Sequence, residues 1–107
     1  MTFAIAPLVP GGAMGSVNAQ PAGNIVSYHV VVTGLVPGST HTIHDHSGSC
    51  TNANGSAHLS VLATTVADSS GVVAFDTTVP AFEFGAGRIV IVYETGSPLR
   101  IIGCASL

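Results

Sequence analysis

The 107-residue chain has no lysine, no tryptophan and little charge of either sign. Only 7% of its residues are charged, two of them arginines, and the formal net charge is −3. An ordinary globular domain carries about 25% charged residues, so small polar side chains must cover most of this surface. Nucleic acid is a poor partner, because neutralising its phosphates needs several Lys or Arg side chains. Weak charge repulsion favours self-association, so we expect a homo-oligomer or another self-assembly.

Long apolar runs are also missing, and no segment reaches the roughly 20 apolar residues of a membrane span. We therefore expect no membrane span. Residues 1–10 are apolar, but they lack a basic segment and contain Pro7 and Pro10. They are interpreted as a first strand and not as a signal peptide. Any export signal is expected to lie outside this sequence.

Turn-forming residues recur at short intervals and separate short runs rich in Val, Ile, Thr and Ala. No segment has a helical period, and this regular punctuation predicts an all-β sandwich or barrel. In residues 25–35, the alternation of Val26, Tyr28 and Val30 indicates a face directed to the core. No linker, repeat or charge run divides the chain, so we expect one domain over residues 1–107. Eight strands are predicted, at residues 3–9, 15–20, 25–35, 40–46, 59–67, 71–79, 88–94 and 99–105.

The chain has two cysteines, Cys50 and Cys104. Such a pair can form a disulfide, ligate a metal, or remain as two buried thiols. The scarcity of charge and the lack of lysine are more typical of an extracellular than of a cytosolic protein, so we favour the disulfide. It would close a loop of about 55 residues, worth roughly 4 kcal/mol in the chain-entropy model. The expected location is extracellular, periplasmic or at a cell surface.

Three of the five histidines lie within residues 41–46. On a strand, His44 and His46 project from the same face with Cα atoms roughly 6.5 Å apart, so their imidazoles can converge on one metal ion. His58 follows the loop over residues 47–57, which could fold it back over the strand as a third ligand. The set favours copper or zinc. The alternative is that these are surface histidines bonded to the backbone.

Other polar residues offer less. His29 lies opposite the apolar face of its strand, so we expect it to be exposed and do not count it as a ligand. Asp45 points away from the paired histidines and is interpreted as a polar surface residue. Glu83 and Glu94 stand alone, and the sequence has no serine nucleophile elbow, paired carboxylates or phosphate-binding glycine loop. Hydrolytic catalysis therefore has no support.

The order of these features resembles the copper/zinc superoxide dismutase family. Residues 34–46 resemble the family segment G-L-x-x-G-x-H-G-F-H-x-H, and residues 66–72 resemble its T-A-D-x-x-G hairpin. Residues 87–94 resemble G-R-x-x-V-V-H-E, and residues 100–104 resemble the terminal R-x-x-C-G. The resemblance covers nearly the whole chain in the same order. It implies an eight-stranded Greek-key β-barrel, in agreement with the predicted strands.

The resemblance also implies ligands. His44 and His46 fall at copper ligands of the family, and His58 falls at the histidine that bridges its two metals. Cys50 falls at the first cysteine of the family's intrasubunit disulfide, whose partner here would be Cys104.

The departures from the family are as informative. Its fourth copper histidine falls at Tyr93, whose phenol is a harder and mostly protonated group. Arg100 is the candidate for the anion-attracting catalytic arginine, but it sits one residue further from its cysteine. The zinc loop is absent after His58, so we do not expect zinc binding of the family kind. The loop that carries guiding charges in the family is reduced to residues 95–99.

Three functions remain open. The first is a copper-binding, copper-only dismutase-like protein with superoxide as substrate. The second is a non-catalytic building block of an extracellular homo-oligomeric or filamentous assembly, a use for which chordin-type domains, which resemble this barrel, offer a parallel. The third is a copper carrier without turnover. We favour copper binding by the histidines and leave open whether the protein is an enzyme.

Overall fold

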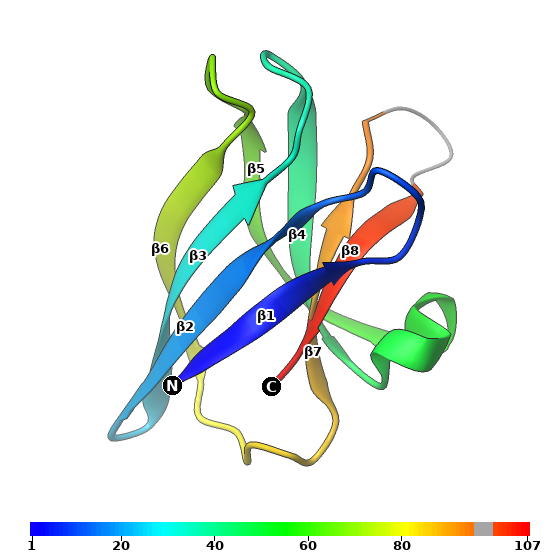
Figure 1. The fold of residues 1–107 in the computed structure, drawn as a ribbon. Helices are drawn as coiled ribbons and strands as arrows, with labels where there is room; N and C mark the ends of the chain where they lie inside the picture. Colours follow the sequence, from blue (N-terminus) through cyan, green and yellow to red (C-terminus); the bar gives the residue numbers. More distant parts are fainter. Residues whose placement is uncertain (96–99) are drawn as a thin grey trace.

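The computed structural model of the protein describes residues 1–95 and 100–107. These residues form eight strands and one short 3-10 helix (Figure 1). The predicted all-β class and the eight strands are confirmed, whereas the start of the last predicted strand at Leu99 lies outside the described residues. No helix in the described part of the chain is long and apolar enough to cross a membrane. The elements are β1 (Thr2–Pro7), β2 (Met14–Ala22), β3 (Ile25–Thr33), β4 (Thr40–Ser47), η1 (Cys50–Gly55), β5 (Ala57–Val66), β6 (Val73–Pro80), β7 (Arg88–Tyr93) and β8 (Ile101–Ser106).

All eight strands belong to one antiparallel sheet, in the order β5-β4-β7-β8-β1-β2-β3-β6. Counted across the gap between the edge strands β5 and β6, the connections from β3 to β4 and from β6 to β7 each pass over two other strands. The sheet curls until its two edge strands, β5 and β6, lie next to each other (Figure 1). The result is a nearly closed barrel with a seam between β5 and β6.

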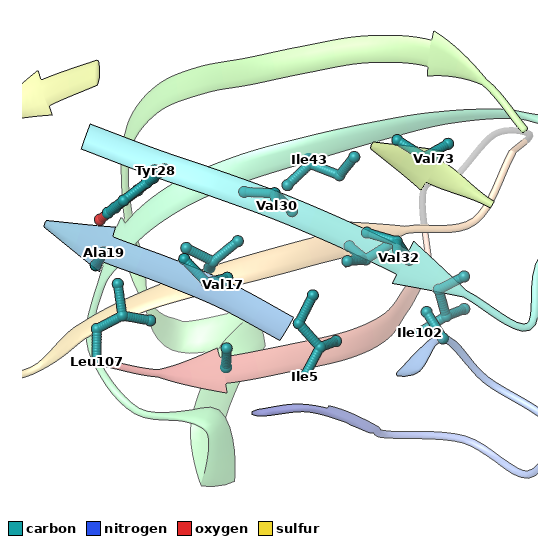
Figure 2. Packing of buried hydrophobic residues seen from close by; sticks show 14 of the residues in the cluster. Ile5, Val17, Ala19, Tyr28, Val30, Val32, Ile43, Val73, Ile102 and Leu107 are labelled. Carbon is teal, nitrogen blue, oxygen red and sulfur yellow. The ribbon is translucent and has the colours of Figure 1, made fainter. Parts of the chain in front are cut away.

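The interior of the barrel is filled by the inward residues of each strand. On β3, Tyr28, Val30 and Val32 are at most 1% exposed, so the predicted core face of this strand is confirmed. Val17 and Ala19 of β2 pack beside them (Figure 2). Burying a side chain of Val or Ile size stabilises a fold by roughly 1.5–3 kcal/mol, and this inner face therefore fixes which way each strand faces.

Strand β7 is buried on both faces. Val90 and Val92 point into the barrel core, while Ile89 and Ile91 belong to a second apolar cluster on the other side of the sheet. Ala53 of η1 completes this second cluster. The loop that carries η1 therefore covers the outer face of β7 and places its own residues beside the outer face of β4, the next strand in the sheet.

A disulfide holds this loop in place. Cys50, the first residue of η1, is bonded to Cys104 of β8 with an S–S distance of 2.02 Å, which confirms the predicted pairing. The helix begins at the N-cap Ser49, whose hydroxyl accepts a hydrogen bond from the Thr51 N–H. The start of η1 is thus held to β8 by the disulfide, and its end continues through Ser56 directly into β5.

Candidate metal centre

The two faces of β4 carry different chemistry. His41, Ile43 and Asp45 are buried on the inner face, whereas His44 and His46 lie on the outer face, as the period of two predicts. Strand β5 pairs with β4 and places His58 directly opposite His46. The register shifts twice along this pair, and the shift between Asp45 and His46 brings His58, and not Leu59, opposite His46.

The three imidazoles meet at one point. One nitrogen from each of His44, His46 and His58 can be chosen so that all lie within 4.8 Å of one another. His44 Nδ1 and His46 Nε2 are 3.3 Å apart, and the ring centroids of His44 and His58 are 4.5 Å apart. Imidazole nitrogens at such separations can ligate a single Zn²⁺ or copper ion. His46 is buried, His44 is half-buried and His58 is exposed, so the centre opens to solvent on the β5 side.

The electrostatics of the cluster favour neutral ligands. Burial, and then the neighbouring His58, lowers the pKa of His44 and of His46 from the ordinary value. A metal binds the neutral base, so a lowered pKa leaves both rings ready to coordinate at neutral pH.

Tyr93, at the end of β7, packs against this cluster. Its ring centroid lies 4.8 Å from that of His44, and its hydroxyl lies 3.4 Å from His46 Nε2. Burial raises the pKa of the Tyr93 phenol, so the hydroxyl stays protonated near neutral pH and can donate toward His46. Tyr93 therefore lies beside His44 and His46 as a neutral phenol.

His41 supports Tyr93 from inside the barrel. It is 5% exposed, and its Nδ1 lies 2.7 Å from the Tyr93 carbonyl oxygen. A carbonyl only accepts, so His41 Nδ1 must carry a proton and donate. Its Nε2 lies 2.6 Å from the Ser39 hydroxyl. The third histidine of residues 41–46 is thus a structural link between β4 and β7.

Arg100 lies elsewhere. Its guanidinium forms an exposed ion pair with Glu94, with 2.6 Å between Nε and Oε2. Arg100, Glu94 and His41 line a small pocket to which none of the three clustered histidines contributes.

The prediction that Asp45 is a polar surface residue is wrong, because its side chain is buried and the residue is only 1% exposed. Arg88 donates to its carboxylate at 2.7 Å, and the Tyr28 hydroxyl donates to the other oxygen at 3.1 Å. Burial raises the pKa of Asp45, and the Arg88 guanidinium opposes that shift. The Arg88 guanidinium in turn lies 4.2 Å from the centroid of the Phe82 ring, so a largely buried network links β3, β4 and β7.

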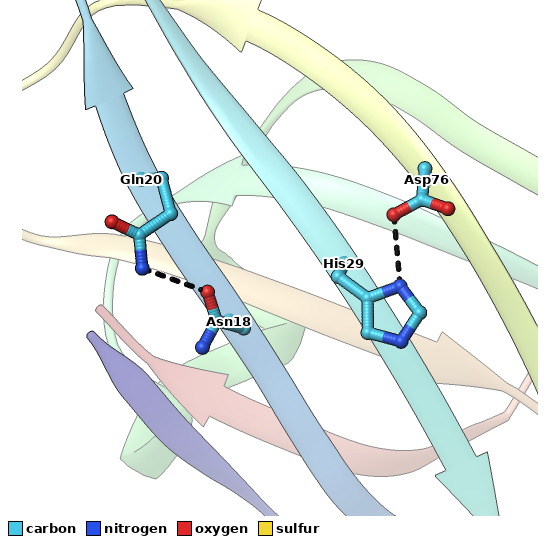
Figure 3. A network of polar contacts seen from close by, with 4 residues as sticks. All are labelled: Asn18, Gln20, His29 and Asp76. Carbon is cyan, nitrogen blue, oxygen red and sulfur yellow. Dashed lines mark hydrogen bonds and ion pairs between the residues drawn. The ribbon is translucent and has the colours of Figure 1, made fainter.

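His29 is exposed, as predicted, and lies on β3, which is adjacent to neither β4 nor β5. Its Nδ1 is 2.8 Å from Asp76 on β6 (Figure 3). On β2, which pairs with β3 on its other side, the Gln20 amide donates to the Asn18 side-chain oxygen at 3.0 Å (Figure 3). This polar face belongs to a different part of the barrel from the three clustered histidines.

Sequence reasoning missed one further residue beside the cluster, Ser56, which follows η1 and lies 2.8 Å from His46 Nδ1. Its only signal in the sequence was its position two residues before His58. No family model matches the chain, and no curated protein matches it either. The geometry of the three histidines is therefore the feature that points to a function.

Proposed function

We propose that the chain is a copper-binding β-barrel protein of the superoxide dismutase type, in which His44, His46 and His58 hold one copper ion. The convergence of three imidazole nitrogens within 4.8 Å carries this proposal. Copper has the highest affinity of the divalent first-row metals for such nitrogen ligands. When bound, copper supplies one-electron chemistry, and the protein supplies two preorganised ligands on β4 and a third on β5.

The fold supports the same assignment. Counted across the seam, the four strands β4 to β7 lie in the order β6-β5-β4-β7. This order supports the proposed Greek key, because in that motif the fourth strand returns beside the first. The Cys50–Cys104 disulfide joins the positions that the resemblance implies. A disulfide is stable in oxidising compartments, which supports an extracellular, periplasmic or cell-surface location.

Turnover of superoxide by this centre would be weak. Steering an anion needs a focused positive field, but the chain has a net charge of −3 and Arg100 is paired with Glu94. Tyr93 stands where the family has its fourth copper histidine. We therefore expect copper binding or carriage as the main property, with superoxide as a poor substrate. We do not propose zinc, because the zinc loop of the family that the chain resembles has no counterpart after His58.

Metal analysis of the purified protein after exposure to copper and desalting tests the proposal. Wild-type protein is expected to retain about one copper per chain, and the double variant His44→Ala/His46→Ala none. His29→Ala is the matched control, because it removes an exposed histidine distant from the cluster, and it should bind as wild type does. Copper-free wild-type protein would refute both the dismutase and the carrier. With copper bound, a superoxide assay separates these two.

A self-assembling building block is the second candidate, and the surface of β5 favours it. Leu59, Val61 and Val66 are each about half exposed on this edge strand, and β5 carries no charged side chain. Light scattering after size exclusion should give a mass of at least two chains, and Val61→Lys should reduce it. A wild-type monomer at high concentration would contradict this candidate.

A further inference from the structure

The hydroxyl of Ser56 makes two contacts at the same time. It donates to the carbonyl oxygen of Ala53 in η1, and it lies 2.8 Å from Nδ1 of His46. Ser56 is the C-cap of η1, with φ −76° and ψ 154°, so it already has the extended backbone of the strand that follows. The loop over residues 48–56, which carries η1 and covers the outer face of β7, is called the covering loop below. The Ser56 side chain links this loop to the metal cluster.

Proton counting determines the direction of both hydrogen bonds. A serine hydroxyl has one hydrogen, and a backbone carbonyl can only accept. Since the hydrogen of Ser56 is directed to Ala53, the Ser56 oxygen must accept from His46. Nδ1 of His46 therefore carries the proton, and Nε2 of the neutral ring carries the lone pair.

We propose that Ser56 is a positioning residue of the metal centre, which fixes His46 in its Nδ1–H tautomer and so presents the Nε2 lone pair to the metal. This inference rests on the proposed copper-binding function. Ligating histidines commonly donate the N–H of their second ring nitrogen to a fixed acceptor, which orients the ring and raises its basicity. Here that acceptor is a side chain delivered by a disulfide-anchored loop.

The surroundings of Nε2 agree with this assignment. His44 Nδ1 lies 3.3 Å from it and the Tyr93 hydroxyl lies 3.4 Å from it. Both groups can donate to a lone pair. The nitrogen that Ser56 leaves unprotonated is therefore the one that faces the other members of the cluster.

Gly48 makes room for Ser56. The residue has φ +152°, and a Cβ at this position would lie 2.6 Å from the Ser56 Cβ, closer than two carbons can approach. The Gly48 N–H donates to the Gly87 carbonyl at 2.7 Å, which holds the end of β4 against the loop before β7. A larger residue at Gly48 would push Ser56 away from His46.

The tautomer can be measured without any metal. Long-range proton–nitrogen NMR correlations of the imidazoles distinguish Nδ1–H from Nε2–H in the metal-free protein. Wild type is expected to show Nδ1–H at His46, Ser56→Ala should lose this preference, and Ser56→Thr, which keeps the hydroxyl, should retain it. An Nε2–H tautomer in wild type, or an unchanged tautomer in Ser56→Ala, would overturn the inference.

Copper affinity provides the second measurement. Loss of such an outer hydrogen-bond partner typically weakens a site 10–100-fold, so Ser56→Ala should bind copper about that much more weakly, while Ser56→Thr stays close to wild type. Ser49→Ala is the matched control, since it removes a hydroxyl at the other end of η1 that does not contact His46. Equal weakening in Ser49→Ala and Ser56→Ala would reduce the role of Ser56 to support of the loop. Wild type with the Nδ1–H tautomer but no copper affinity would refute the copper proposal alone.

Discussion

Asp45 is a carboxylate enclosed by an apolar barrel, and its partners determine whether the fold tolerates it. Arg88 and the Tyr28 hydroxyl occupy both of its oxygens. The gain from a buried ion pair is often small compared with the cost of desolvation, but removing one partner leaves a buried charge uncompensated. Removing one partner of Asp45 should therefore lower the free energy of unfolding by more than the intact pair contributes to it.

Arg88→Met tests this at neutral pH. The variant keeps an apolar stem over Phe82 but leaves Asp45 unpaired, so we expect the free energy of unfolding in urea to fall by about 3 kcal/mol. Without Arg88, the pKa of the buried carboxyl rises further, and the folded state binds a proton more readily than the unfolded chain. The loss should therefore shrink as pH falls, and Asp45→Asn/Arg88→Met should lack this recovery. Wild-type stability in Arg88→Met would contradict the role of the pair.

The histidines predict a second pH dependence, of the opposite sign. The pKa of His44 and of His46 is lowered by burial and by His58, whereas histidines in the unfolded chain titrate near about 6.5. As pH falls through that value, the unfolded chain takes up protons first, so the free energy of unfolding of the metal-free protein should fall and then level off below the folded pKa. Urea unfolding between pH 8 and pH 5 measures this. His44→Ala/His46→Ala should give a flatter profile, and an equally steep one would contradict the explanation.

At the scale of the elements, β4 shows both the strength and the limit of sequence patterns. The period of two correctly placed His44 and His46 on one face, and it also placed Asp45 on the opposite face. That face is the core, and reading Asp45 as a surface residue was wrong, because its polar partners lie on β3 and β7, which are distant in sequence. Ser56 could not be found from local pattern either, since its role depends on where η1 rests against β4.

Removing the disulfide of the covering loop tests whether the position of Ser56 depends on how η1 is held against the barrel. Cys50→Ser/Cys104→Ser opens a cross-link between residues 54 apart in sequence, which should lower the free energy of unfolding by about 4 kcal/mol in the chain-entropy model. Because η1 carries Ser56 toward His46, copper affinity should fall as well. Urea unfolding and copper titration measure the two effects. Lower stability with unchanged affinity would mean that the loop positions Ser56 without its disulfide.

At the scale of the whole molecule, regular turn signals and alternating apolar residues predicted eight strands, and the structure contains eight in its described part. The order of those strands in the sheet did not follow from the alternation, because pairing between β3 and β6 or between β4 and β7 depends on contacts distant in sequence. The Greek-key expectation came from the family resemblance alone. Charge composition predicted neither feature, but it underlies the expectation of self-association.

The seam between β5 and β6 has a consequence for local unfolding. Backbone amides at the edge of a sheet exchange their hydrogens with solvent through small openings that leave the rest of the fold intact. His58 lies on β5, and its two partner histidines lie on β4, so an ion bound by all three would link the edge strand to the interior of the sheet. Copper should therefore slow hydrogen exchange across β5 far more than across β2, and exchange of β5 amides becomes a direct reporter of whether the centre is filled.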